Sequence, residues 1–423
     1  MISQKIRNWL NKEKKKHTLS VNRKNISTLK NWHYSHKDIS HKSGKFFKIV
    51  GLKIYSNFFK KNWDQPIIVQ NEVGILGIIK DEINHKYLLQ AKVEPGNKNK
   101  LQLSPTVQAT KSNYKQVHGG KKVPYLKYFL NVNKKKIMNQ SEQGFRYFNK
   151  FNSNILINIK NKIDLLPGFF WFNLNELDAL IKKKNILNMD TISVFSSFIK
   201  KSKNDNPFNS LKKINTIIKQ HDRKFFIKKK IIPLKNLNDW KFTQNEISHK
   251  NKKHFSVIGV KVKTNKREVG KWEQPLIKGK KSALAGFLIK KINNTDHYLC
   301  RYILKPGLKK SAITCTVNTS EVNNYMNNQN LTIDQKKLIK KFFFNKTKNN
   351  KLIFDNIISD EGGRFYHCEI RNIAVLLTKK INIKLPKTYF WISQNQMINM
   401  IKKKRVDIEG RLLFGCINIK NLI

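Results

Sequence analysis

The chain repeats itself, and this duplication constrains its fold more than any other feature. Residues 29–54 (LKNWHYSHKDISHKSGKFFKIVGLKI) match residues 237–262 (LNDWKFTQNEISHKNKKHFSVIGVKV). Further segments match in the same order, and near the end residues 166–184 match residues 385–404. Chance does not produce such a series. The sequence therefore predicts two copies of a unit of roughly 200 residues, each long enough for a core of its own.

The repeat divides the chain into four predicted parts. Residues 1–28 form a basic N-terminal extension, which we expect to be helical, and residues 29–200 form the first repeat. Residues 201–230 are charged and contain a proline, as is typical of a linker. Residues 231–423 form the second repeat.

Each copy carries the same order of expected elements. Residues 74–80 (GILGIIK) and residues 86–93 (KYLLQAKV) are apolar, and we expect two buried strands with a turn between them. Near the end of the first copy, Asn173-x-x-Glu176 predicts a capped amphipathic helix, and its twin is Ser393-x-x-Gln396. This mixture of strands and terminal helices predicts an α+β fold.

The net charge of +58 normally indicates a nucleic acid or an anionic membrane as partner. The lysines are spread through both copies, however, which favours compositional drift and a solvated lysine surface. Such a surface still attracts an anionic ligand. No apolar run is long enough to span a bilayer, so we expect no membrane association. The four cysteines include no C-x-x-C pair, and the expected location is a reducing cytoplasm without a zinc site.

Neutral polar side chains gather in residues 90–114, an unusual feature in so lysine-rich a chain. They predict a polar ligand pocket in the first copy, because the second copy has lost most of the pattern. Drift in the second copy and selection in the first explain this difference equally well. The polar residues are Gln90, Gln102, Ser104, Thr106, Gln108 and Asn113.

Glu94 is the leading candidate for a general base. It ends an apolar strand just before a Pro-Gly turn, where burial would raise the pKa of its carboxyl group, although a solvated turn residue is the alternative. Lys92 lies on the same strand face and either stabilises an enolate or phosphate or is one lysine among many. His118 precedes Gly119 and Gly120, whose backbone N–H groups can approach an anion closely.

Other candidate residues occur in both copies. Trp63 and Gln65 correspond to Trp272 and Gln274, and they serve either binding or the fold. Two further motifs, SEQGFRYF at residues 141–148 and SDEGGRFY at residues 359–366, also correspond. They place Arg146 opposite Arg364, with Glu361 nearby, in a segment that either completes a pocket across the two copies or does so across a dimer.

At this point the motifs identify a family resemblance. Eight segments closely resemble the NDP-hexose 2,3-dehydratase family: HKSGKFFKIVGLKI, WDQPII, GILGIIK, QAKVEPGN, QLSPTVQATKSNY, VHGGK, PYLKYF and SEQGFRYF. The resemblance implies a tandem Nudix-like fold. It also implies a homodimer that needs neither a cofactor nor a metal and whose product passes to a ketoreductase. The implied substrate is a dTDP-4-keto-6-deoxyhexose, and the implied reaction belongs to the deoxysugar biosynthesis of antibiotics and other secondary metabolites.

The resemblance also suggests roles for the candidate residues. Glu94 or a histidine would be the base, and His118 or Tyr114 the acid. Glutamine and threonine side chains would hold the sugar, and Trp63 would either stack on the substrate or anchor the core. The second copy lacks much of the polar pattern, so a second pocket lined by Trp272, Gln274, Glu361 and Arg364 would be degraded.

Two other functions remain open at this stage. One is a non-catalytic protein on a duplicated Nudix-like scaffold that binds a nucleotide or, less in keeping with the scattered lysines, a nucleic acid. The other is a degenerate enzyme kept for its structure. Neither alternative requires the loss of water from a nucleotide sugar, so a turnover assay separates both from the dehydratase.

Overall fold

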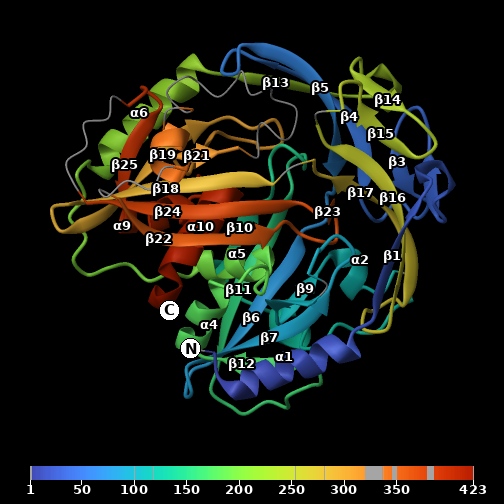
Figure 1. Ribbon diagram of the computed structural model, residues 1–423, viewed down its shortest axis with the longest axis horizontal. Helices are drawn as coiled ribbons and strands as arrows, with labels where there is room; N and C mark the ends of the chain where they lie inside the picture. Colours follow the sequence, from blue (N-terminus) through green and yellow to red (C-terminus); the bar gives the residue numbers. More distant parts are fainter. Residues whose placement is uncertain are drawn as a thin grey trace.

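The computed structural model describes most of the chain as helices and strands (Figure 1). The described residues are 2–99, 101–117, 119–252, 254–280, 282–319, 336, 338–344, 350–378 and 385–422. Within them the strands form four sheets, two large and two smaller. This arrangement confirms the mixture of helices and strands predicted from the sequence. Each half of the chain contributes one large and one smaller sheet.

The two large sheets have the same topology. In each, the β-hairpin predicted from the apolar segments pairs in parallel with a later strand, β6 with β11 and β18 with β24. The first sheet contains β6 (Gly74–Asp81), β7 (Lys86–Val93), β8 (Leu101–Pro105), β9 (Val107–Ala109), β10 (Ile137–Ser141), β11 (Phe151–Ile159) and β12 (Phe169–Phe172). The second contains β18 (Ala283–Ile292), β19 (Thr295–Ile303), β20 (Ala312–Thr314), β21 (Val317–Asn318), β22 (Asn350–Ser359), β24 (Glu369–Leu377) and β25 (Tyr389–Ser393).

The two smaller sheets exchange strands between the halves. The first consists of β2 (Trp32–Tyr34), β3 (Ile39–His41), β4 (Lys48–Ser56), β5 (Lys61–Val69) and β13 (Ile227–Ile232). The second consists of β14 (Trp240–Phe242), β15 (Glu246–His249), β16 (Ser256–Thr264), β17 (Lys271–Lys278), β23 (Phe365–Tyr366) and β1 (Leu19–Lys24). Strand β1 thus pairs with β16, and β13 pairs with β4. Each half therefore completes a sheet of the other.

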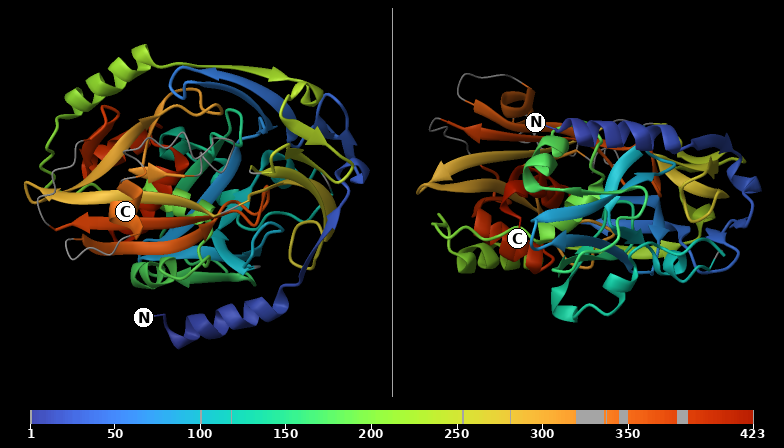
Figure 2. Two further views of the ribbon diagram at one scale, coloured as in Figure 1. Left: turned by 45° about the horizontal axis from the view of Figure 1, so that its top comes forward. Right: turned by 90° about the horizontal axis from the view of Figure 1, so that it is seen from below.

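The helices cover the sheets and join the halves. They are α1 (Gln4–Lys16), α2 (Lys111–Tyr114), α3 (Lys127–Leu130), α4 (Leu174–Ile181), α5 (Met189–Ser197), α6 (Leu211–Lys224), α9 (Gln394–Lys402) and α10 (Ile408–Asn418). Helix α1 runs along the edge of the first half (Figure 2). Its Trp9 packs on Phe170 with ring centroids 5.0 Å apart. In the region expected to be the linker, α6 buries Ile214 and Ile218. No described helix is long and apolar enough to cross a membrane.

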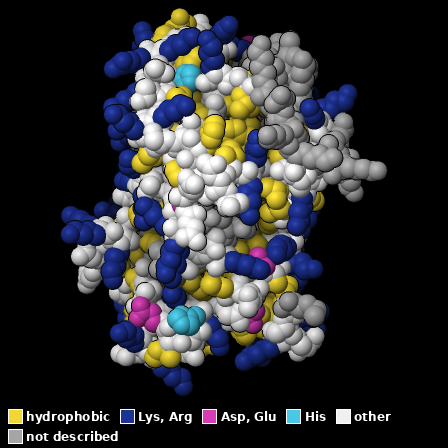
Figure 3. All heavy atoms as spheres, turned by 90° about the vertical axis from the view of Figure 1, so that its left-hand side faces the viewer, with side chains coloured by type: hydrophobic (Ala, Val, Ile, Leu, Met, Phe, Trp, Pro, Cys, Tyr) yellow, Lys and Arg dark blue, Asp and Glu magenta, His cyan; other side chains and the backbone are white. Residues whose placement is uncertain are grey.

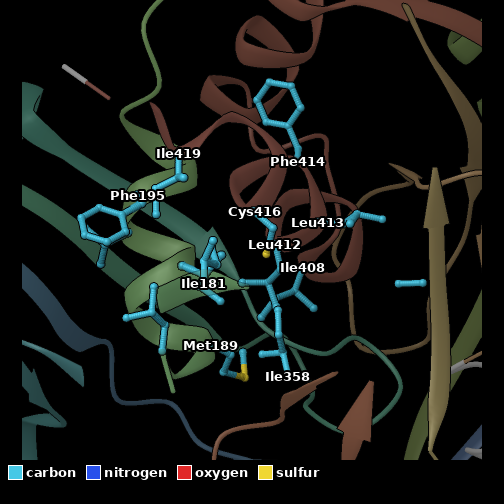
Figure 4. Close-up of a cluster of buried hydrophobic side chains, with 14 of the residues drawn as sticks. Ile181, Met189, Phe195, Ile358, Ile408, Leu412, Leu413, Phe414, Cys416 and Ile419 are labelled. Carbon is cyan, nitrogen blue, oxygen red and sulfur yellow. The ribbon is translucent and has the colours of Figure 1, made fainter. Parts of the chain in front are cut away.

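The two halves share a core at the contact between α5 and α10 (Figure 4). Phe195 and Met189 of α5 lie in the same apolar cluster as Leu412 and Phe414 of α10. A Cβ at Gly415 would lie 2.9 Å from the Cβ of Ser196, so only glycine allows this close approach. Because residues of both halves are buried in the same apolar cluster, the two halves pack into one structural unit.

Local sequence signals explain the predicted elements. The Asn173 side chain accepts a hydrogen bond from the Glu176 backbone N–H at 2.9 Å, and the Glu176 carboxylate accepts one in return. Ser393 and Gln396 form the same capping box at the start of α9. Both predicted helix starts are confirmed. The surface view shows lysine and arginine spread along the whole length of one face (Figure 3), as the scattered sequence positions indicate.

Candidate active site

A small cavity of about 70 Å³ collects seven charged side chains where the two halves meet. We call it the Glu94 cavity. Strand β7 and the residue after it supply two of these side chains and α5 one, while three come from the second half of the chain. The charged residues are Lys92, Glu94, Lys150, Asp190, Arg267, Glu361 and Arg364. Buried charges are costly unless they are paired, so a cluster of this density indicates a functional site.

Glu94 lies at the centre of this network and is buried. The Gly362 backbone N–H donates to Oε2 of Glu94 at 3.1 Å, and Nε2 of Gln108 donates to Oε1 at 3.1 Å. The Arg267 guanidinium lies 3.7 Å from Oε1. These donors surround an anion, and Gln108 is itself held by Asn188, whose Nδ2 donates to Oε1 of Gln108 at 3.0 Å.

Asp190 is the second buried carboxyl group. It occupies the first turn of α5, whose N-terminal cap is Asn188. Burial raises the pKa of Asp190 well above its usual range, and the nearby carboxylates of Glu361, Glu142 and Glu94 raise it further. The ammonium of Lys92 acts in the opposite direction but does not cancel these effects. Asp190 therefore holds its proton at a pH where an exposed aspartate is ionised.

Glu361 reaches the cavity from the second half, on the loop before β23. The hydroxyl of Tyr147 donates to Oε2 of Glu361 at 2.8 Å. Burial raises the pKa of Glu361 and raises the pKa of Tyr147 well above its usual range. The loop is held to the first half because the Gly96 N–H donates to the Gly362 carbonyl at 2.7 Å.

Two buried lysines face these carboxyl groups. Burial lowers the pKa of Lys92, with the Arg267 charge as the second cause, and its ammonium donates to the Gln108 carbonyl at 3.0 Å. Burial lowers the pKa of Lys150 to about 8, and its ammonium donates to the Glu72 carbonyl. Next to Lys150, burial raises the pKa of Glu142 to about 7. The cavity therefore combines groups that release and accept protons near neutral pH.

Some of the residues predicted from the sequence meet in this cavity. Lys92, Glu94, Gln108 and Asn113 line it from the first half. Glu361 and Arg364, which the sequence assigned to a separate second pocket, line the same cavity.

The conserved tryptophans and glutamines of the two copies lie elsewhere and support the fold. The indole N–H of Trp63 donates to Oε1 of Gln65 at 2.9 Å, and Nε2 of Gln65 donates to the Phe145 carbonyl at 2.6 Å. Trp272 and Gln274 form the same pair at 3.0 Å, and Gln274 donates to the Gly363 carbonyl at 2.7 Å. Each pair therefore anchors the loop that passes between the halves.

Four polar residues of the sequence stretch, Gln90 among them, lie outside the cavity lining, and the other three bind neighbouring backbone or side chains. The Thr106 hydroxyl accepts from the Ile79 N–H at 3.0 Å and donates to a carbonyl of β7. Ser104 donates to the carbonyl of Gln90 at 3.5 Å. Gln102 accepts from Nδ2 of Asn97 at 2.8 Å. The pairing of β7 with β8 places Gln90 and Lys92 on the same sheet face as Ser104 and Gln102, so strand alternation alone does not decide which of these side chains lines the cavity.

The remaining predicted residues are more distant. Tyr114 lines a separate surface hollow, and burial followed by the Glu72 charge raises its pKa. Gly119, with φ of 66°, and Gly120 form a turn closed by Gln116. His118 lies outside the described residues. Arg146 is buried 3.2 Å from Oδ2 of Asp360, in the region that corresponds to the Glu94 cavity in the second half.

Several cavity residues were not foreseen from the sequence, namely Asp190, Tyr147, Lys150, Asn152 and Arg267. Asp190 follows a helix cap and Arg267 belongs to the β16–β17 hairpin of the other half, so neither stands near Glu94 in the sequence. Tyr147 lies within the SEQGFRYF motif and Lys150 follows it closely. This proximity was the available signal in the sequence. Among the described residues, no three His, Cys, Asp or Glu side chains are placed to hold a metal ion.

The corresponding place in the second half is filled. Lys305 stands where the first half has Glu94, and it is fully buried. Its ammonium lies 2.8 Å from Oδ2 of Asp407 and 2.6 Å from Oε2 of Glu409. We call these three residues the Lys305 cluster. In this cluster one ammonium lies directly against two carboxyl groups, whereas the charged side chains of the first half line a cavity.

Comparisons with known proteins agree with this duplication. The model of the NDP-hexose 2,3-dehydratase family matches residues 3–198 and 211–417, one segment in each half. A dTDP-4-dehydro-6-deoxy-alpha-D-glucopyranose 2,3-dehydratase from Saccharopolyspora spinosa is 30% identical, over 97% of this chain and 90% of the relative. Enzymes of the same name from Amycolatopsis orientalis and Streptomyces violaceoruber are 29% and 30% identical, covering 99% and 97% of this chain and 90% and 95% of their own lengths.

Proposed function

The chain belongs to the NDP-hexose 2,3-dehydratase family, and we propose that the Glu94 cavity is where it removes water from a nucleotide sugar. The protein is a hydro-lyase that acts on dTDP-4-dehydro-6-deoxyglucose in deoxysugar biosynthesis. The observation that carries the assignment of the site is the pairing of Glu94, ringed by donors, with Asp190, which holds its proton.

The substrate itself determines what the site must supply. The ketone at carbon 4 acidifies the hydrogen on carbon 3, so a base removes that proton and the electron pair moves onto the ketone oxygen as an enolate. The enolate then expels the hydroxyl on carbon 2, which leaves as water after taking a proton from an acid. The resulting enol moves its proton from the carbon 3 oxygen to carbon 2 and becomes a 3,4-diketo sugar. One base, one acid and donors for the enolate are sufficient.

Glu94 is the proposed base. It is buried beside Lys92 and Arg267, and two of its hydrogen-bond donors, Gln108 and Gly362, keep its carboxylate oriented. The low polarity of a buried site strengthens the interaction of this carboxylate with a substrate proton.

Asp190 is the proposed acid, and this assignment differs from the two acids inferred from the sequence. Its raised pKa keeps it protonated to a higher pH than an exposed aspartate, and an acid for a leaving hydroxyl must carry its proton. Lys150 lines the same cavity and is the proposed donor for the enolate oxygen. At about 70 Å³ the cavity is smaller than typical ligand sites, so we propose that Gln108, which is only partly buried, turns aside when the sugar enters.

The assay that tests the function is incubation with dTDP-4-keto-6-deoxyglucose, followed by mass spectrometry for the loss of one water. We expect the product to appear without any added cofactor. Asp190→Asn should retain the substrate yet lower turnover by about 10²-fold or more, since an amide cannot supply the proton. Normal turnover by Asp190→Asn would exclude it as the acid. Absence of product with the unmodified protein would contradict the function itself.

The proposal extends to the finer expectations from the family resemblance. We take residues 29–200 and 231–423 as two Nudix-like repeats, with residues 1–28 and 201–230 as extension and linker. The twin sheets with their parallel pairs β6–β11 and β18–β24 support this reading. A cytoplasmic homodimer that hands its unstable diketo product to a ketoreductase in the pathway of an antibiotic completes the proposal, and it rests on the resemblance alone.

A further inference from the structure

A wide groove of about 750 Å³ lies next to the Glu94 cavity and has no part in the chemistry described above. One wall is the segment from β3 to the start of β4, and the other is α2 with the turn that follows it. The end of β5 forms the floor between them. A volume of this size is typical of a site for a small organic ligand.

The groove and the cavity share their dividing wall. Gln70 and Gly74 line the cavity, whereas the neighbouring residues Val69, Asn71 and Glu72 line the groove. The same alternation occurs in the facing segment. There Thr110 and Asn113 line the cavity, and Lys111, Ser112 and Lys115 line the groove. One ligand can therefore occupy the groove and the cavity at the same time by crossing the segment that separates them.

The groove is strongly positive. Five lysines line it, and none of them forms an ion pair with another described residue. They are Lys42, Lys45, Lys48, Lys111 and Lys115. The two carboxylates in the groove are already engaged, because both oxygens of Glu72 accept from Ser112 and Asp38 accepts from Ser40. Like charges held on facing walls attract a multivalent anion such as a diphosphate.

Aromatic rings complete the groove. The ring of Phe46 is half-buried and contacts His41, with ring centroids 4.5 Å apart. Phe47 is covered by the Arg364 guanidinium, whose centre lies 4.2 Å from the ring centroid. Arg364 also lines the Glu94 cavity, so it stands at the junction of the two spaces. Its buried Nε has no hydrogen-bond partner among the described residues, which leaves a cationic donor at that junction.

We propose that this groove binds the nucleoside diphosphate part of the substrate. The base stacks on the ring of Phe46, the phosphates lie among the lysines of the two walls and Arg364, and the hexose passes into the Glu94 cavity. The inference rests on the proposed function, because it takes a nucleotide sugar as the ligand. It assigns recognition to the β3–β4 segment and α2, and chemistry to the cavity behind them.

Isothermal titration calorimetry with dTDP and with thymidine tests the proposal. The double variant Lys48→Glu/Lys111→Glu reverses one charge on each wall, and each reversal should raise the Kd of dTDP at least about tenfold, or about 1.4 kcal/mol. Thymidine carries no phosphate, so its binding should be unchanged. Phe46→Ala should instead weaken both ligands.

The control is Lys309→Glu/Lys310→Glu, which makes the same change in net charge on an exposed turn of the second half. All variants carry exposed or half-buried substitutions, and thermal unfolding checks that they fold. The proposal fails if the Kd of dTDP is unchanged in the groove variant. It also fails if the control weakens binding equally, since the general field of the protein would then be responsible.

The outcomes separate this inference from the function. Water loss from the sugar by the unmodified protein, with normal dTDP binding by the groove variant, overturns the groove and leaves the dehydratase in place. Tight, groove-dependent dTDP binding without water loss supports the groove and contradicts the dehydratase.

Discussion

The two halves of this protein build the same place in two different ways. In the first half, Glu94 precedes a Pro-Gly turn and faces a cavity that also holds Asp190. In the second half, Lys305 precedes the same turn and is enclosed by Asp407 and Glu409, the residues that correspond to Asn188 and Asp190 at the start of the matching helix. One scaffold thus carries a charged cavity in the first half and a buried ion-pair cluster at the corresponding place in the second.

The hairpins that reach across the halves show the same contrast. The β16–β17 hairpin brings Arg267 into the Glu94 cavity. The β4–β5 hairpin brings Phe58 to the second half, where it packs on Ile303 and Leu308 beside the Lys305 cluster. An arginine keeps a polar opening, whereas an aromatic ring fills the space.

This difference indicates what the second half contributes to the site. Its Lys305 cluster stands where the first half has Glu94, and the second half supplies Arg267, Glu361 and Arg364 to the cavity of the first half. A duplicated unit that donates loops to its twin cannot be lost without dismantling the site. In the proposed assignment, one half holds the reacting groups and the other completes their surroundings.

Glu94→Gln gives the largest expected effect. The amide keeps the shape of the side chain but cannot remove a proton, so turnover should fall by about 10²- to 10⁴-fold. Steady-state kinetics on dTDP-4-keto-6-deoxyglucose measures this, with dTDP affinity as the internal control, which should hardly change. Normal turnover would remove Glu94 from the mechanism and leave the two halves without a functional distinction.

Lys305→Met should act on stability instead. It removes the ammonium that lies 2.8 Å from Asp407 and 2.6 Å from Glu409 in this buried cluster, which costs about 3–5 kcal/mol of unfolding free energy. Urea denaturation measures the loss, and turnover per folded molecule should remain unchanged. The triple variant Lys305→Met/Asp407→Asn/Glu409→Gln should recover part of the stability. A drop in turnover of the folded protein would show that the second half also takes part in the chemistry.

The pH dependence offers a third test, because the pKa of Lys150 is lowered to about 8. As the pH rises through this value the ammonium loses its proton, and the cavity loses a positive charge. We expect kcat/KM to fall about tenfold for each further pH unit on the alkaline side. Lys150→Arg keeps its charge and should move that fall to higher pH, relative to its own rate at pH 7. An unchanged profile would separate Lys150 from catalysis.

The paired hairpin variants give the smallest expected effects. Arg267→Met should lower kcat/KM by about tenfold, because the site loses a cation beside Glu94. Stability should fall less than in Lys305→Met, since the Arg267 side chain is 15% exposed and Glu94 keeps Gln108 and Gly362 as donors. Phe58→Ala should do the reverse and cost about 1–3 kcal/mol of stability without lowering turnover. Equal effects of the two variants on turnover would contradict the division between the halves.

The local elements of the fold could be predicted from the sequence because their signals lie within a few residues. Apolar segments such as residues 74–80 predicted strand β6, and the capping boxes at Asn173 and Ser393 predicted the starts of α4 and α9. Glu94 stood out for the same reason, as an acidic residue at the end of an apolar strand.

The composition of the site was harder to predict because its members come from distant segments. Thr106 and Gln102 are as polar as Gln108, yet their side chains bind a backbone carbonyl and Asn97 rather than line the cavity. Asp190 and Arg267 carry no local motif that links them to Glu94. Their roles depend on which strand face and which hairpin reach the cavity.

The sequence alone therefore determined that the chain is duplicated, that each copy mixes strands with capped helices, and that the first copy holds the richer polar set. Only the tertiary structure decided that β1 and β13 change halves and that Glu361 and Arg364 serve the cavity of their twin. The physical reason is the range of the interactions. Hydrophobic period and helix caps act between near neighbours, whereas a buried charge finds its partners wherever packing brings them together.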